Sequence, residues 1–288
     1  MKYINIIAEG SSEEAFVNDV LVHHFAQMNK FVSVRKIETG WDRINNKPAK
    51  GGLLKYIKLR NDILRWIQSD RGKQDTWYTT FVDLYAFPKD SLSPYTPQLQ
   101  TIVNPYQKIT ALEAAIAQDI NHPNFIPYVQ LHEFEALLMV EPDRLLGMYP
   151  DGQKGITRLK RDINGMNPEE INESPQTAPS KRIIKHLPDY AGQKAQVGPM
   201  VAQDIGLNLL RQKCPHFNKW ITAGIISSPG ETSFLFDRGE NNRMVPYNIE
   251  EVIETDYPTE TFQDKYFVIK DKKQLKESVK FMYNKFIK

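Results

Sequence analysis

The segment Tyr3-Ile4-Asn5-Ile6-Ile7-Ala8-Glu9-Gly10 decides the fold of this chain. Its isoleucine-rich alternation predicts a β-strand that ends at Ala8, where Glu9-Gly10 breaks the pattern. The spacing of Ser11 and Glu14 predicts a capping box at the start of a helix. Apolar residues then recur at helical period, namely Phe16, Val17, Val20, Leu21, Phe25 and Met28. A strand that leads straight into a helix is the first half of a βα unit.

The same alternation of strand and helix continues along the first half of the chain. Further strands are predicted at residues 31–37, 77–82 and 125–131, and helices at residues 53–67, 109–120 and 132–139. Pro127 indicates that the last of these strands lies at an edge or starts late, because proline cannot donate to a sheet. The pattern predicts an α/β fold with a Rossmann-like, mostly parallel sheet flanked by helices.

The pattern changes twice beyond residue 150. Residues 162–179 are polar and irregular, and helices are predicted at residues 181–186 and 197–213. After residue 221, a strand at 266–269 and an amphipathic helix at 275–286 predict a small α+β tail. We therefore predict three parts: an α/β core at residues 1–150, a helical extension of the same domain at 151–221, and a C-terminal fragment at 222–288.

The composition is that of an ordinary globular protein, with 41% hydrophobic and 25% charged residues and a net charge of +2. Its single cysteine, Cys214, cannot form an intramolecular disulfide, which fits a reducing compartment. The N-terminus lacks the features of a signal peptide, and no apolar run approaches the roughly twenty residues that span a bilayer. We therefore expect a cytoplasmic protein without a membrane segment.

Acidic residues stand at the ends of three predicted strands. Glu9 follows the first strand, Asp83 follows the third, and His132-Glu133-Phe134-Glu135 follows the fourth. Sites in open α/β sheets form at the carboxyl ends of the strands. Carboxylates that converge there suit Mg²⁺ or Mn²⁺, which can activate water and polarise a phosphoryl oxygen. The alternative is that such acids only cap helices, as we expect for Glu13 and Glu14.

Several other polar residues could have either a functional or a structural role. Pro179-Ser180-Lys181-Arg182 begins a predicted helix, so Ser180, Lys181 and Arg182 form either a phosphate seat or an ordinary helix start with solvated cations. Lys194 is a further candidate cation. His132 could ligate a metal or move a proton, although a lone histidine at such a corner is more often structural.

Several motifs give the chain a resemblance to known families. Ile6-Ile7-Ala8-Glu9-Gly10, followed by Glu13-Glu14, resembles the "EG" motif that opens Toprim domains, which occur in primases, topoisomerases and the overcoming-lysogenization-defect nucleases. Residues 1 to about 221 resemble the bacterial domain-of-unknown-function family numbered 4276, which is Toprim-like. The matching motifs are Glu9-Gly10-Ser11-Ser12-Glu13-Glu14, Phe81-Val82-Asp83-Leu84-Tyr85, His132-Glu133-Phe134-Glu135-Ala136-Leu137-Leu138 and Cys214-Pro215-His216-Phe217.

This resemblance implies a metal-dependent nuclease acting on DNA or RNA. Glu9 would be a general acid/base or a metal ligand, and Asp83 would stand where Toprim proteins carry an Asp-x-Asp pair. Tyr85 replaces the second acid of that pair, so Glu133 or Glu135 would supply the missing carboxylate. Mg²⁺ or Mn²⁺ would be the cofactor.

Further residue roles and partners are expected outside the carboxylates. In the nuclease hypothesis, and from their place at the predicted helix start rather than from the resemblance, Lys181 would take part in catalysis and, together with Arg182, would neutralise phosphate charge. Relatives of this type sit beside AAA- or ABC-type ATPases in antiviral defence loci, which implies an ATPase partner. The missing second aspartate favours an alternative, a non-catalytic module that binds nucleic acid or the ATPase.

The tail resembles a second family. Residues 222–231 and 256–269 are similar to the C-terminal segment of aromatic amino-acid (phenylalanine) hydroxylases. Those enzymes hold iron with two histidines in a His-x4-His array, and no two of the six histidines here have that spacing. We therefore expect a fused fragment that serves packing or homodimerisation rather than an iron site.

Overall fold

The structure is a computed structural model that describes residues 2–37, 41–42, 47–48, 53, 55–71, 73, 75–85, 87–172, 176–226, 234–238, 244–248 and 267–269. The chain divides into two compact units, Met1–Asn218 and Lys219–Lys288. Within the described ranges, the search for helices with the length and apolarity of a membrane span finds none.

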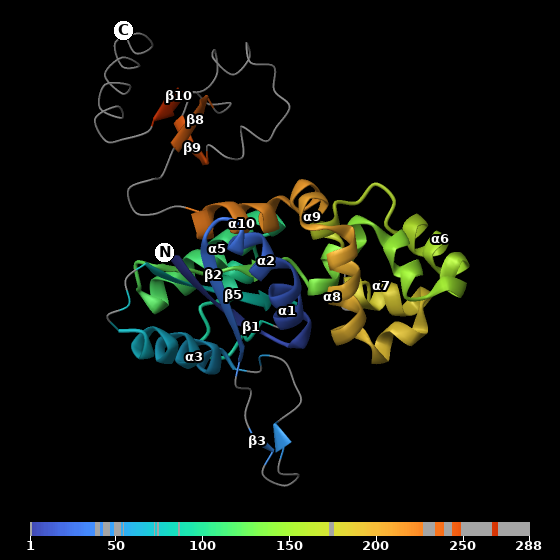
Figure 1. Cartoon of the computed structure of the whole chain (residues 1–288), viewed down its shortest axis with the longest axis horizontal. Coiled ribbons are helices and arrows are strands. Elements are labelled where there is room, and N and C mark those ends of the chain that lie inside the picture. The colour runs from blue at the N-terminus through green and yellow to red at the C-terminus, as the bar shows by residue number, and fades with distance from the viewer. Residues whose placement is uncertain are drawn as a thin grey trace. The chain divides into compact units, whose positions relative to one another are not determined.

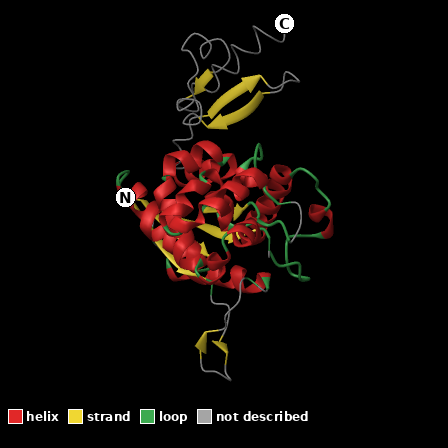
Figure 2. Cartoon of the chain, turned by 90° about the vertical axis from the view of Figure 1, so that its right-hand side faces the viewer, coloured by secondary structure: helices red, strands yellow, loops and turns green. Residues whose placement is uncertain are grey.

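The first unit is built on a parallel sheet with the strand order β2-β1-β5-β6, and β7 also pairs with β5 (Figure 1). The strands are β1 (Lys2–Ala8), β2 (Lys30–Lys36), β5 (Thr76–Asp83), β6 (Phe125–Ile126) and β7 (Val129–Gln130). Helices surround these strands (Figure 2), which confirms the predicted α/β class. Because β1 and β5 are parallel neighbours, the residues that follow them meet at one edge of the sheet.

One face of the sheet packs on the long helices α3 (Tyr56–Ser69) and α5 (Pro105–Ile120). Their apolar stripes face inward at helical spacing, and Leu59, Ile63 and Leu112 are fully buried. Asn104 begins α5 with a side-chain cap, since its Oδ1 accepts a hydrogen bond from Gln107 N at 3.0 Å, and Pro105 occupies the first turn.

The other face carries an aromatic core. The Phe16 ring packs edge-on against the rings of Phe81, Phe134 and Phe217, with centroid distances of 6.2, 5.7 and 6.1 Å. Phe16 ends α1 (Ser11–Phe16), and the chain continues as a π-helical turn (Val17–Leu21) and α2 (Val22–Ala26). This core joins the first helix to segments that follow it by more than a hundred residues.

Short helices complete the first unit. The 3₁₀-helix Phe134–Val140 follows the sheet, and α8 (Lys194–Ile205) packs against both α1 and this segment (Figure 1). The remaining helices are α4 (Pro97–Gln100), α6 (Gln153–Asp162), α7 (Pro179–His186), α8 (Lys194–Ile205), α9 (Leu207–Lys213) and α10 (Pro215–Ile226), with 3₁₀ turns at Pro142–Gly147, Pro150–Gly152, Pro168–Glu170 and Pro188–Gly192.

The described residues form two further small sheets. Strands β3 (Trp41–Asp42) and β4 (Lys47–Pro48) form an antiparallel pair. In the second unit, β8 (Phe234–Arg238), β9 (Met244–Asn248) and β10 (Phe267–Ile269) form an antiparallel sheet. Strand β10 lies within the strand predicted at residues 266–269. The predicted helix at 275–286 lies outside the described residues, as does most of the hydroxylase-like segment.

Several predicted elements differ from the observed ones. The fourth strand is two short strands because Pro127 interrupts the ladder. The helix predicted at 197–213 breaks at Gly206, whose φ of +86° suits glycine. The segment at 132–139 is a 3₁₀-helix that begins at Phe134. The capping box predicted for Ser11 and Glu14 is not observed. Gly10 is the N-cap residue, and only one half of a box forms, in which Glu13 Oε2 accepts a hydrogen bond from Gly10 N, because glycine has no side chain.

Candidate functional site

Glu9 lies where β1 and β5 end side by side. Its backbone N donates a hydrogen bond to the Phe81 carbonyl at 2.9 Å, which extends the ladder by one residue. Its two carboxylate oxygens accept backbone N–H groups from Leu53 at 3.3 Å and Asp83 at 2.9 Å. Burial raises the pKa of Glu9, and these two hydrogen bonds oppose the increase.

Glu13 is the acid whose place among the buried carboxylates the sequence did not reveal. It is buried, and its Oε2 accepts a hydrogen bond from Gly10 N at 2.8 Å, so it does cap α1 as expected. A Cβ atom at residue 10 would lie 3.1 Å from that oxygen, so glycine permits the close approach. Burial, followed by the charges of Glu9 and Glu135, raises the pKa of Glu13 to about 8.

Asp83 ends β5 beside these two glutamates. Its Oδ1 is buried and has no hydrogen-bond partner among the described residues. Burial is the main cause of a pKa well above the usual aspartate range, and the charges of Glu13, Glu9, Glu135 and Glu133 add to it in that order. A buried carboxylate oxygen without a donor is costly, and it is the atom in this site most ready to accept a ligand.

Glu133 and Glu135 belong to the same region, because the charges of both act on Asp83. Glu133 Oε2 accepts a hydrogen bond from Ser180 N at 2.9 Å, in the first turn of α7. Glu135 Oε1 lies 3.3 Å from the Tyr190 hydroxyl, which donates to it, and 3.7 Å from Lys194 Nζ. Burial raises the pKa of Glu135, whereas the Lys194 charge lowers it.

The structure thus brings four predicted acids and one unexpected one into a single acidic cluster, defined here as Glu9, Glu13, Asp83, Glu133 and Glu135. The charges of the other four acids all act on Asp83. Among the described residues, no three His, Cys, Asp or Glu side chains are arranged to hold one metal ion. The donor chemistry fits Mg²⁺ or Mn²⁺, because all donors are carboxylates and one oxygen is unsatisfied. The side chains would have to close around such an ion.

The predicted phosphate seat is only partly supported. Arg182 is buried and donates to the carbonyls of Thr177 and Asp162, at 2.8 and 3.3 Å, so it braces the loop before α7. The first-turn N–H of Ser180 is used by Glu133, while the buried Ser180 hydroxyl has no partner among the described residues. Lys181 is exposed, and Lys194 is the cation that lies at the acidic cluster.

His132 lies at the edge of this region in a left-handed conformation, with φ of +68°. Its Nδ1 lies 3.1 Å from Asn172 Nδ2. Burial and then the Lys108 charge lower its pKa to about 4, so the ring is neutral at pH 7. These contacts give it a structural partner, as the more common alternative for a lone histidine predicted.

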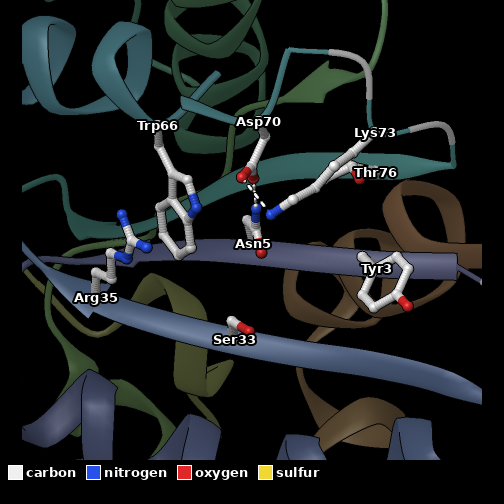
Figure 3. Close-up of a pocket in the computed structure, with 8 residues that line it drawn as sticks. All are labelled: Tyr3, Asn5, Ser33, Arg35, Trp66, Asp70, Lys73 and Thr76. Atoms are coloured by element: carbon white, nitrogen blue, oxygen red, sulfur yellow. Dashed lines mark hydrogen bonds and ion pairs between the residues drawn. The ribbon is translucent and has the colours of Figure 1, made fainter. Parts of the chain in front are cut away.

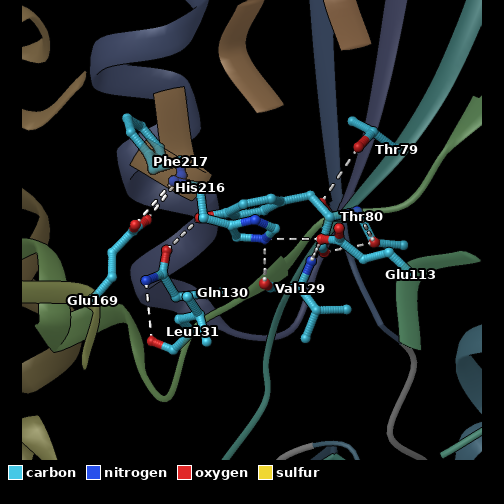
Figure 4. Close-up of polar contacts among 10 residues, drawn as sticks. Thr79, Thr80, Glu113, Val129, Gln130, Leu131, Glu169, His216 and Phe217 are labelled. Atoms are coloured by element: carbon cyan, nitrogen blue, oxygen red, sulfur yellow. Dashed lines mark hydrogen bonds and ion pairs between the residues drawn. The ribbon is translucent and has the colours of Figure 1, made fainter. Parts of the chain in front are cut away.

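A buried polar brace behind the sheet was also missed by sequence reasoning (Figure 4). Both carboxylate oxygens of Glu169 accept backbone N–H groups at the start of α10, from His216 at 2.9 Å and Phe217 at 2.8 Å. The His216 ring stacks on Tyr128, and its Nε2 lies 3.0 Å from Glu113 Oε1. The motif Cys214-Pro215-His216-Phe217 therefore fixes the start of a helix. The contacts that its residues make with distant segments were not visible in the sequence.

A separate pocket of about 530 Å³ lies along strands β1 and β2 and the start of β5 (Figure 3). Its walls include Asn5 of β1, Thr76 of β5 and Arg35 of β2, whose guanidinium lies 4.1 Å from the centroid of the Trp66 ring. Asp70 is its only carboxylate among the described residues. The acidic cluster lies instead at the carboxyl ends of β1 and β5, where sites in parallel sheets form.

Comparison with known proteins identifies one family. Its description is Domain of unknown function (DUF4276), and it matches residues 8–223. Neither the curated proteins nor the solved structures that were compared include a match. The match includes every residue of the acidic cluster, and it ends within α10. This chain therefore belongs to the family described as Domain of unknown function (DUF4276).

Proposed function

We propose that this protein is a metal-dependent nuclease of Toprim type that hydrolyses phosphodiester bonds in DNA or RNA. The observation that carries the proposal is the convergence of acids from three strand ends on Asp83, whose Oδ1 is buried without a partner. A group of buried carboxylates with raised pKa values is unfavourable unless protons or cations compensate it. A divalent cation would compensate the negative charges and could also activate a water molecule for hydrolysis.

The roles of the side chains follow from their positions. Glu9, Asp83 and Glu135, with Glu133 beside them, would hold Mg²⁺ or Mn²⁺, which supplies charge neutralisation and an activated water when bound. Glu13 approaches Glu9 while it retains a proton near neutral pH, so it is positioned to exchange one. Lys194, at 3.7 Å from Glu135, would meet a phosphate oxygen, and the exposed Lys181 would add positive charge nearby.

A second candidate is a non-catalytic module that binds nucleic acid or an ATPase. Two observations favour it. Tyr85 occupies the position of the second aspartate of Toprim proteins and is 40% exposed. In addition, no three acids among the described residues are arranged as ligands of one ion. The two candidates differ in whether metal binding depends on the acidic cluster.

The test is cleavage of labelled single-stranded and duplex oligonucleotides of DNA and RNA, with Mg²⁺, with Mn²⁺ and with a chelator. We expect wild-type protein to cleave only with metal. Glu9→Gln keeps the size of the side chain and removes the charge, so cleavage should fall about 100-fold or more, the usual contribution of a catalytic acid or base. Asp204→Asn is the matched control, because Asp204 is an exposed acid on α8.

Each outcome selects one candidate. Cleavage by Glu9→Gln at the wild-type rate removes Glu9 from the mechanism and contradicts the assignment of the activity to the acidic cluster. Absence of cleavage in both proteins, together with no Mn²⁺ binding by titration calorimetry, supports the non-catalytic module.

The location of the protein and its partners are also proposals. A cytoplasmic protein agrees with the lack of a membrane-spanning helix in the described ranges and with a single buried cysteine, Cys214. An AAA- or ABC-type ATPase partner and a role in antiviral defence rest on the Toprim resemblance. Co-purification with the ATPase encoded beside this protein would test them. Homodimerisation through the tail would be tested by the mass of the full chain in solution.

A further inference from the structure

A second pocket of about 530 Å³ lies where β5 and β7 end. Its lining includes Tyr85 and Lys89 after β5, Lys108 of α5, His132 after β7, and Asn172. The pocket adjoins the acidic cluster along the backbone. Leu84, which also lines it, directly follows Asp83, and His132 directly precedes Glu133. Leu84 belongs to the core on the α3 and α5 side, whereas Asp83 interacts with Glu13 of α1, so the pocket and the acidic cluster lie on the two sides of this backbone segment.

Hydrogen bonds fix that backbone segment. Leu84 N donates to the Gln130 carbonyl at 3.0 Å, and Tyr85 N donates to the His132 carbonyl at 2.9 Å. The two chain segments therefore continue side by side beyond the sheet, with Asp83 and Glu133 serving the acidic cluster. The left-handed backbone of His132 costs free energy, and such strain concentrates at binding and catalytic sites.

Charge and aromatic surface in this pocket match a nucleotide. Neither Lys89 nor Lys108 has a carboxylate partner in the described part of the chain. Lys89 Nζ lies 5.7 Å from the centroid of the Tyr95 ring, and the Tyr85 ring is 40% exposed. The Asn172 Oδ1 atom is buried and has no partner among the described residues. One acid, Glu170, also lines the pocket, so the two lysines leave a positive balance.

We propose that this pocket binds one nucleotide of a single-stranded nucleic acid, with its base on the Tyr85 ring and its phosphate at Lys108 and Lys89. This inference rests on the proposed function, because it supplies the substrate for the acidic cluster. It also explains the departure at residue 85. The residue that replaces the second aspartate lines the pocket instead of completing the acidic cluster.

The shape of the pocket favours a single strand over a duplex. A cavity of about 530 Å³ accepts one unstacked nucleotide, whereas the bases of a duplex stay stacked inside the helix. Aromatic rings bind single strands because every base has a face to stack on, at about 1–3 kcal/mol for each base.

The test measures binding apart from cleavage. A fluorescent twelve-residue oligothymidylate is titrated with the full chain in a chelator, and its anisotropy is read. We expect Tyr85→Ala to weaken binding by about 5- to 100-fold, the range of one lost stacking contact, and Tyr85→Phe to restore it. Lys108→Ala should weaken binding and reduce its salt dependence. Lys213→Ala is the matched control, because Lys213 is exposed and does not line the pocket.

The outcomes separate this proposal from the nuclease. If Tyr85→Ala and Lys108→Ala bind as wild type does, the pocket proposal is wrong, even when Glu9→Gln abolishes cleavage. If they lose binding while Glu9→Gln cleaves normally, the pocket proposal stands and the nuclease assignment of the acidic cluster fails. Equal binding of a blunt duplex, or binding of thymidine monophosphate without binding of the oligonucleotide, also overturns the single-strand proposal.

Discussion

At the scale of single residues, Glu13 gives the acidic cluster a pH dependence. Its pKa is about 8 in the folded protein, against an ordinary value of 4.5. The folded state therefore keeps a proton that the unfolded state releases, so the stability of the metal-free protein falls as the pH rises from about 4.5 to about 8. We expect Glu13→Gln to be more stable than wild type at pH 8 and to show no such gain at pH 5.

Thermal unfolding in a chelator at both pH values measures this difference. Each kcal/mol gained corresponds to a rise of about 2–4 °C in a unit of this size. The matched control is Glu14→Gln, because Glu14 is the neighbouring acid, paired with Lys36 at 3.0 Å on the surface. Its effect should stay within about 0.5 kcal/mol at both pH values. A Glu13→Gln variant that follows the wild-type pH profile would contradict the burial of this charge.

Asp70 supports a second prediction about a single residue. Its Oδ2 accepts hydrogen bonds from Asn5 at 2.8 Å and from the Tyr78 hydroxyl at 3.2 Å, and Lys73 pairs with Oδ1 at 2.5 Å (Figure 3). Asp70→Ala leaves two buried donors without an acceptor, so we expect a loss of about 2–4 kcal/mol in the free energy of unfolding. Chemical denaturation measures it.

The surface provides the control for that experiment. Asp143 pairs with Lys160, and the two side chains are 40% and 50% exposed. Asp143→Ala should therefore cost no more than about 1 kcal/mol. Equal losses for Asp70→Ala and Asp143→Ala would show that the Asp70 contacts do not contribute as the structure indicates.

The residues of the site were predictable only in part. Glu9 and Asp83 were predicted because each directly follows a strand of a parallel sheet, where topology alone sets the position. Glu13 was assigned only to the helix start, since its spacing fits a cap and its burial depends on segments far along the chain. Arg182 was expected to meet phosphate, but it binds the carbonyls of Thr177, before α7, and Asp162, at the end of α6, and sequence patterns do not show that these atoms lie together.

At the scale of elements, the packing of α6 against α7 depends on Gly155. A Cβ atom there would lie 2.3 Å from the His186 carbonyl oxygen, and a backbone atom cannot move aside cheaply. We expect Gly155→Ala to destabilise the protein by about 1–3 kcal/mol, although alanine is the better helix former. Because α7 carries Ser180, which binds Glu133, cleavage should fall as well if the nuclease proposal is right.

Gly147→Ala is the matched control, because nothing lies within 4 Å of a Cβ at that position. Thermal unfolding of the two variants should separate by several degrees. A Gly155→Ala protein as stable as Gly147→Ala would mean that the two helices pack less closely than described.

Element prediction succeeded where one period dominates. Strand β5 and helices α3 and α5 have apolar residues at regular spacing, and the structure has them within a few residues of the predicted ranges. The region after Leu131 was harder. Nearly every residue from Phe134 to Met139 is buried, so a helical period could not be distinguished from the 3₁₀-helix that forms. A segment that is buried on all sides has no polar face, so its sequence does not show which helical period it follows.

At the scale of the whole molecule, the acidic cluster and the nucleotide pocket both belong to the first unit. Their residues lie between Glu9 and Lys194, and that unit comprises Met1–Asn218. The alternation of strands and helices in the sequence predicted a mostly parallel sheet. It did not predict which strands are neighbours in the order β2-β1-β5-β6. The neighbours matter, because only the pairing of β1 with β5 joins Glu9 to Asp83.

The family match and the contact boundary end at different residues of α10. The match reaches residue 223, inside α10 (Pro215–Ile226), although the contact boundary falls at Asn218. Trp220 and Ile221, in the middle of α10, are 4% and 0% exposed. A chain that stops after Asn218 keeps only the first four residues of α10, which is too short a segment to form a stable helix. A chain that stops after Ile226 keeps the helix whole.

We therefore expect residues 1–226 to unfold cooperatively within a few degrees of the full chain, and residues 1–218 to unfold at much lower temperature or to aggregate. Circular dichroism during heating measures both. If the acidic cluster is a nuclease, the chain of 226 residues should also cleave at the rate of the full protein, because none of the residues assigned to the cluster or the pocket lies beyond Lys194. Unfolding of the 226-residue chain at the temperature of the 218-residue chain would show that the second unit supports the first. Normal stability with lost cleavage would instead mean that residues beyond 226 contribute to the site.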